Sequence, residues 1–152
     1  MKSQTSKVLF RICGRELIGL VVDAAADAGL NPIVAVVSPQ DSQVIRDTLG
    51  QGVVCVEQTR PLGTWHALLQ AKSALKGLKS VVVLCGDVPL IRPATIKRLV
   101  ELHDNKEACI TLLTSTVADP KGLGRIIRSP SGLITAVVEE QDADKNTLLI
   151  PE

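Results

Sequence analysis

The chain has 152 residues, 45% of them hydrophobic and 22% charged, which fits one globular domain with a sizeable core. Its 17 basic and 16 acidic side chains are intermingled and leave a formal net charge of +1, so the sequence lacks the basic footprint of a nucleic-acid-binding protein. One tryptophan and one phenylalanine also leave almost no aromatic platform for stacking the bases of a single strand.

Four widely spaced cysteines include no Cys-x-x-Cys pair, which argues against a zinc site or a disulfide framework and favours a reducing cytosol. Two of them, Cys55 and Cys85, lie in apolar runs and are expected to be buried thiols. No apolar run approaches the roughly 18 residues needed to span a bilayer, and the first four residues lead into no signal core. We therefore expect a cytoplasmic protein without a membrane anchor.

Apolar periodicity predicts that strands and helices alternate along the chain up to residue 107. Helical spacing is found over residues 16–28, 40–49, 64–75 and 94–103. Short apolar runs predict buried strands at residues 33–37, 53–56, 81–85 and 108–115. Residues 124–128 and 133–139 flank a Ser-Pro-Ser-Gly turn and predict a hairpin or meander. The pattern predicts one α/β domain over residues 1–152, a three-layer Rossmann-like fold with a mostly parallel sheet and a C-terminal hairpin.

The stretch at residues 81–90, VVVLCGDVPL, is central to this prediction because its apolar start is typical of a strand buried on both faces. Gly86 permits a turn and close approach of a ligand, and Pro89 prevents continuation of the strand. Asp87 would then lie just past the carboxyl end of a central strand, where open α/β sheets bind ligands. The alternative from this stretch alone is that Asp87 only makes a turn.

Four tracts match one known family in order and spacing across essentially the whole chain. They are residues 58–67 (QTRPLGTWHA), 86–90 (GDVPL), 119–126 (DPKGLGRI) and 138–143 (VEEQDA). The sequence thereby resembles the nucleotidyltransferase domain of bacterial UDP-N-acetylglucosamine pyrophosphorylases. The resemblance implies transfer of UMP from UTP to N-acetylglucosamine 1-phosphate, a step toward cell wall precursors, with release of pyrophosphate and with Mg²⁺ as cofactor.

The resemblance also implies roles at matching positions. Gln58, Gly63 and Thr64 would contact the uracil, and a carboxamide suits a base edge because it both donates and accepts hydrogen bonds. Gly86 would line the same substrate site. His66 matches a family histidine, and we expect it to be structural because no nucleophile is paired with it.

The remaining implied roles concern charge and the sugar. Asp87 would be a magnesium ligand, which suits an ion that needs only one or two carboxylates beside phosphates. Lys7 would neutralise phosphate charge. Gly124 and Glu139 would hold the amino sugar. The alternatives left open are an exposed lysine, a hairpin glycine and a strand-end glutamate.

The chain departs from the family pattern at its beginning, where only Met1-Lys2-Ser3 corresponds to a strand and glycine-rich loop that cradle the nucleotide phosphates. It also ends before further family positions for the sugar and a second metal ligand. We expect these losses to impair catalysis by this chain alone, since positioning and charge stabilisation supply most of the rate. Trp65 replaces a family glycine, and the sequence leaves open whether its indole blocks the pocket or lines it.

The absent strand is the central one in the family's sheet, so a gap is expected between the strands at residues 33–37 and 81–85. Because unpaired buried backbone is costly, we expect that these strands pair directly or that another chain supplies the missing strand, a homo-oligomer being one source of it. Functionally, a nucleotidyltransferase domain competes with a non-catalytic nucleotide-binding or scaffold module. A relative that uses CTP or GTP is a third alternative, although Gln58 and the Leu-Gly-Thr tract favour uridine.

Overall fold

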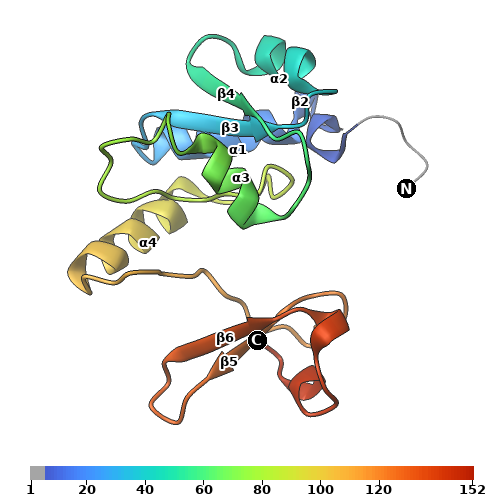
Figure 1. Cartoon of the computed structure of the whole chain (residues 1–152), viewed down its shortest axis with the longest axis vertical. Helices are drawn as coiled ribbons and strands as arrows, with labels where there is room; N and C mark the ends of the chain where they lie inside the picture. Colours follow the sequence, from blue (N-terminus) through green and yellow to red (C-terminus); the bar gives the residue numbers. More distant parts are fainter. Residues whose placement is uncertain (1–5) are drawn as a thin grey trace. The chain divides into compact units, whose positions relative to one another are not determined.

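The computed structural model describes residues 6–152, which form two compact units with the boundary after Glu107 (Figure 1). The expectation that Met1-Lys2-Ser3 is a remnant of a phosphate loop lies outside the described residues. No helix within residues 6–152 is long and apolar enough to cross a membrane.

The first unit contains all four α-helices of the described chain and its parallel strand pair. In chain order its elements are η1 (Lys7–Leu9), β1 (Arg11–Ile12), β2 (Arg15–Glu16), α1 (Leu17–Asp27), β3 (Ile33–Val37), α2 (Ser42–Leu49), β4 (Val53–Glu57), α3 (Thr64–Ala71) and α4 (Pro93–Asn105). These bounds confirm the helices and strands predicted between residues 16 and 57 and the helix after Pro93. The third helix is shorter than predicted because it gives way to turns between residues 72 and 77.

The core of this unit lies beside the parallel pair of β3 and β4, which run side by side in Figure 1 with Ile33 opposite Val53 and Val37 opposite Glu57. Ile18 of α1, Ile45 of α2 and Cys55 of β4 form one buried cluster with Val37. α1 and α2 bring their apolar stripes to this cluster, as the 3.6-residue spacing requires.

Two predicted strands are absent from the sheets. Among residues 6–152, hydrogen-bonded strands form three two-stranded sheets, and neither residues 81–85 nor residues 108–115 belong to any of them. Residues 81–85 keep a strand-like alternation of exposure, with Val81, Val83 and Cys85 exposed and the residues between them half-buried. The expectation of a buried Cys85 is therefore wrong, because a strand buried on both faces needs neighbours that this segment lacks.

The second unit is built on the predicted hairpin. Its elements are β5 (Arg125–Arg128), β6 (Ile134–Val138), η2 (Glu140–Asp142) and η3 (Thr147–Leu149). β5 and β6 are antiparallel, with Arg125 opposite Val138 and a register irregularity at Ile127 and Arg128. In the turn, the Ser129 amide donates to the Leu133 carbonyl at 2.8 Å, which confirms the turn predicted from Ser-Pro-Ser-Gly.

The side-chain carboxylate of Glu152 binds the last residue to this hairpin through hydrogen bonds. Arg128 Nε donates to Glu152 Oε2 at 2.8 Å, its Nη2 pairs with Oε1, and Thr114 Oγ1 donates to Oε1 at 2.7 Å. The Arg128 and Thr114 hydrogen bonds lower the pKa of Glu152 from 4.5 to about 2. Since the folded pKa is depressed, the stability that this carboxylate contributes is fully present above pH 4.5 and is lost as the pH falls towards 2.

Carboxyl-carbon NMR of Glu152 is therefore expected to show a titration midpoint near 2 in the native protein. The substitution Arg128→Met removes the main cause and is expected to raise the midpoint into the ordinary glutamate range. A native midpoint at 4.5 would contradict the ion pair.

Candidate functional site

A cavity of about 650 Å³ lies in the first unit between β3 and residues 81–86. Its walls are mainly aliphatic, its polar lining side chains are uncharged, and no acidic or basic residue of the described chain contributes to it. Four residues predicted to contact the substrate line it: Gln58, Gly63, Thr64 and Gly86. The fold therefore brings together the implied nucleotide-binding residues from three separate segments.

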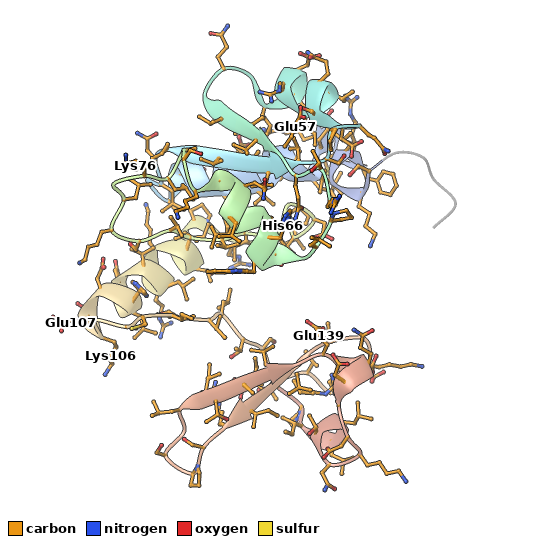
Figure 2. All side chains as sticks on the ribbon, viewed as in Figure 1. Glu57, His66, Lys76, Lys106, Glu107 and Glu139 are labelled. Atoms are coloured by element: carbon orange, nitrogen blue, oxygen red, sulfur yellow. The ribbon has the colours of Figure 1, made fainter. Side chains whose placement is uncertain are left out.

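Gln58 is fixed at the carboxyl end of β4 by its backbone and its side chain. Its amide nitrogen donates to the Val37 carbonyl at 2.8 Å, which continues the β3–β4 ladder by one step. Its Nε2 donates to the Gly63 carbonyl at 3.3 Å and is hydrogen-bonded to His66 Nδ1 at 2.9 Å. His66, labelled on α3 in Figure 2, accepts this hydrogen bond through Nδ1. A structural role for His66 is thus observed, namely to orient Gln58.

Gly63 is the residue before α3 and has φ 90° and ψ 177°, a region that is essentially restricted to glycine. A Cβ atom there would meet nothing within 4 Å, so the restriction comes from the backbone and not from space. Through its carbonyl, this residue also accepts the hydrogen bond from Gln58. The turn into α3 therefore requires glycine at this position.

The substitution Gly63→Ala is expected to destabilise the first unit by about 1–3 kcal/mol because of this backbone strain. Urea unfolding followed by helix ellipticity measures the effect. Gly52→Ala is a matched control, since Gly52 has no positive φ and no neighbour within 4 Å of an added Cβ. Equal effects of the two substitutions would show that the Gly63 conformation is not required.

Asp87 and Lys7 lie next to a packed contact at the carboxyl end of residues 81–86. An added Cβ on Gly86 would approach Val8 Cγ1 to 3.2 Å, so these two residues pack closely. Asp87 follows Gly86 in an exposed turn closed by the Val88 amide and the Cys85 carbonyl at 3.2 Å. Lys7 precedes Val8 in η1 and is also exposed. Lys7 and Asp87, the predicted phosphate-neutralising and metal-binding residues, therefore each lie one residue from the contact between Val8 and Gly86. Neither residue lines the cavity.

No group of three or more His, Cys, Asp or Glu side chains suited to a metal ion occurs within residues 6–152. Asp87 therefore offers a single carboxylate, and such a donor fits magnesium only when phosphate oxygens and water complete the coordination. Trp65 is 71% exposed and does not line the cavity. Its indole neither blocks nor lines the pocket.

Gly124 and Glu139 face each other in the second unit, where Glu139 follows β6 (Figure 2). A Cβ on Gly124 would lie 3.7 Å from Glu139 Oε2, an ordinary van der Waals distance, so Gly124 and this carboxylate are direct neighbours. The preceding loop is held by Glu140, whose Oε2 accepts from the Gly122 amide at 2.9 Å. The implied sugar-binding pair is thus brought together by the hairpin.

Arg125 supports this loop and was not singled out from the sequence. Its side chain is 2% exposed, Nη1 donates to the Leu123 carbonyl, and Nη2 lies 4.0 Å from Glu140 Oε1. Its Nε has no hydrogen-bond partner within the described residues. The signal available in the sequence was an arginine at an inward-facing position of a predicted strand. A charged side chain is almost never buried at such a position without a partner, so this arginine indicates a structural role with a paired group.

The prediction that residues 33–37 and 81–85 pair directly is wrong. Within residues 6–152, β3 pairs only with β4, and the cavity occupies the space where direct pairing was expected. The second alternative, a strand supplied by another chain, stays a prediction.

This arrangement defines an incomplete α/β nucleotidyltransferase fold. It is shared with a UDP-glucose pyrophosphorylase from Acinetobacter baumannii, with a TM-score of 0.59 and 19% identity over 91% of this chain and 61% of that one. Residues 1–145 match the MobA-like NTP transferase domain, and the chain belongs to that family. It is also 36% identical over its whole length to the bifunctional protein GlmU of Clostridioides difficile and 44% identical to that of Pelotomaculum thermopropionicum. It spans about a third of the length of these relatives, at 33% of each.

Proposed function

We propose that this domain binds UTP in the described cavity and acts in the transfer of UMP to N-acetylglucosamine 1-phosphate. The observation that carries the proposal is the meeting of Gln58, Gly63, Thr64 and Gly86 in one uncharged cavity. They lie at or after the carboxyl ends of their extended segments, which is where open α/β sheets bind ligands. The family membership and the GlmU relatives support the same class of reaction.

The proposed base preference rests on the orientation of Gln58. Its amide nitrogen is engaged by Gly63 and His66, so the carbonyl oxygen is the group left to meet a ligand. An acceptor in that position complements the ring N3–H of uracil and opposes the unprotonated N3 of cytosine. Uridine is therefore the favoured nucleotide over cytidine.

In this proposal Asp87 would hold Mg²⁺ together with the nucleotide phosphates, and Lys7 would neutralise part of their charge. Bound magnesium would stabilise the charge that develops on the transferred phosphoryl group. Gly124 and Glu139 would bind the amino sugar, since a carboxylate accepts hydrogen bonds from sugar hydroxyls. The single carboxylate at Asp87 implies that the metal binds only with the nucleotide.

The same observation supports a second candidate function, a non-catalytic nucleotide-binding or scaffold module. Nucleotidyl transfer depends on positioning and charge stabilisation, and no acidic or basic residue of the described chain lines the cavity. Such a module would bind UTP without releasing pyrophosphate.

Two measurements separate the alternatives. Titration calorimetry with UTP, and separately with UDP-N-acetylglucosamine, each with and without magnesium, is expected to show saturable, magnesium-dependent binding. Pyrophosphate release from UTP and N-acetylglucosamine 1-phosphate then tests turnover. Binding with turnover supports the transferase, and binding without turnover supports the module. No binding at millimolar ligand would contradict the transferase and the nucleotide-binding module, and would leave the scaffold module.

A further inference from the structure

The side-chain amide of Gln58 has one orientation that suits its neighbours. Its Nε2 carries two hydrogens, and two acceptors face it, the Gly63 carbonyl at 3.3 Å and His66 Nδ1 at 2.9 Å. A carbonyl oxygen can only accept, so turning the amide over would set Gln58 Oε1 against the Gly63 carbonyl. Both hydrogens are therefore used within the protein, and Oε1 is the atom left for a ligand.

The two contacts that hold this amide are unequal. The distance of 3.3 Å to the Gly63 carbonyl is longer than usual for such a hydrogen bond, and the contact is exposed to water. The distance of 2.9 Å to His66 Nδ1 is typical, and this contact is partly buried, where water competes less for the donor. His66 is therefore the principal anchor of the Gln58 amide.

The imidazole is placed by a packed helix and not by a loop. His66 lies in the first turn of α3, which begins at Thr64. This helix packs against β3 and β4, and its last residue, Ala71, is buried. His66 itself does not line the cavity, so it reaches a ligand only through Gln58.

An acceptor at this position controls which base edge the site can read. Without it, only the long contact to Gly63 opposes a turn of the amide about its terminal torsion, which is roughly two-fold. Nε2 would then face the ligand and donate to the unprotonated N3 of cytosine, whereas Oε1 accepts from the N3–H of uracil. The choice between the two bases therefore depends on the side chain that fixes the amide.

We infer that His66 is a positioning residue that sets the base specificity of this domain through the orientation of Gln58. The inference rests on the proposed function, because it concerns which nucleotide the cavity binds. It assigns the preference for uridine to a side chain outside the cavity lining. The preference can therefore be removed without changing any residue that lines the cavity.

Titration calorimetry with UTP and with CTP, each with magnesium, measures the specificity as a ratio of two affinities. The native protein is expected to favour UTP about tenfold or more, because CTP sets its N3 acceptor against Gln58 Oε1. His66→Leu removes the anchoring acceptor and is expected to bring the two affinities within about threefold of each other. His66→Asn offers an amide oxygen close to the position of Nδ1 and is expected to keep the preference.

Gln58→Ala is the control for the route of the effect. It removes the amide, so UTP and CTP are expected to bind within about threefold of each other, and adding His66→Leu is expected to leave that ratio unchanged. If His66 only stabilised α3, His66→Leu would weaken UTP and CTP by the same factor, and the native ratio would persist.

A readout without nucleotide separates this inference from the proposed function. NMR of the ligand-free protein is expected to show that the side-chain amide protons of Gln58 exchange about tenfold more slowly than those of Gln51. Gln51 is the reference because it lies exposed in a turn of the same unit. His66→Leu is expected to remove most of the difference.

A tenfold preference for UTP that persists in His66→Leu would overturn the inference, and so would equal exchange at Gln58 and Gln51 in the native protein. A change of the ratio by His66→Leu in the Gln58→Ala background would also overturn it, because the imidazole would then act by another route. If neither nucleotide binds while the Gln58 amide is protected, the proposed function fails and the specificity role fails with it, although the hydrogen bond is confirmed.

Discussion

The substitution Asp87→Asn is expected to weaken magnesium-dependent UTP binding about 100-fold, because it removes the carboxylate proposed to hold the metal. Loss of a group that only supports a metal ligand already lowers metal affinity by about 10- to 100-fold. The change keeps the shape of the side chain and removes its charge, and the described residues offer no cluster of carboxylates to replace it. Asp87 is exposed in its turn, so the fold is expected to survive. Titration calorimetry with UTP, with and without magnesium, measures the effect. The loss is expected in the presence of magnesium only.

Asp27→Asn is a matched control, since Asp27 is an exposed carboxylate in the same unit and does not line the cavity. It changes the net charge equally and is expected to leave UTP binding unchanged. Thermal unfolding of both variants checks that the fold is retained. Equal weakening by both substitutions would indicate a general charge effect and would remove Asp87 from the proposed site.

The elements that sequence reasoning predicted best are those that local patterns specify. The run at residues 33–37 is β3 residue for residue, because five apolar residues, four of them β-branched, are too few for a helix and favour a strand. The hairpin formed by β5 and β6 was predicted because Ser-Pro-Ser-Gly between two alternating runs defines a turn. In both cases the determining residues lie next to each other in the chain.

Predictions failed where the outcome depends on a neighbour far away in the sequence. Residues 81–85 have the composition of a central strand, yet a strand exists only when another segment hydrogen-bonds to its edge, and β3 does not. The exposed Cys85 follows from the same missing neighbour. The surroundings of a side chain are equally hard to predict, as shown by Trp65, which follows Gly63 and Thr64 in the chain but is exposed and does not line their cavity.

The candidate site was predictable as a set of residues but not as a geometry. Gln58 and Gly63 were identified by their tract, and both line the cavity. The hydrogen bond from Gln58 to His66 required α3 to place the imidazole beside the end of β4, a tertiary fact. The support that Arg125 and Glu140 give to the Gly124 loop likewise depends on the pairing of β5 with β6.

The substitution Ile45→Ala is expected to lower the free energy of unfolding of the first unit by about 2–5 kcal/mol. Ile45 is 2% exposed and packs with Ile18, Val37 and Cys55, so the truncation leaves a cavity among side chains from three other elements. All four α-helices of the described chain lie in this unit, so helix ellipticity in a urea titration reports its unfolding. The transition midpoint is expected to fall with little change in its slope.

Val44→Ala provides the matched control because Val44 is the adjacent residue of α2 and is 53% exposed. Removing its methyl groups changes little buried surface, and alanine is the better helix former, so the effect is expected to stay within about 0.5 kcal/mol. If Ile45→Ala cost no more than this control, the cluster at β3 would not be the core that holds the unit. The cavity walls would then lack a fixed frame, because β3 is positioned by that same cluster through Val37.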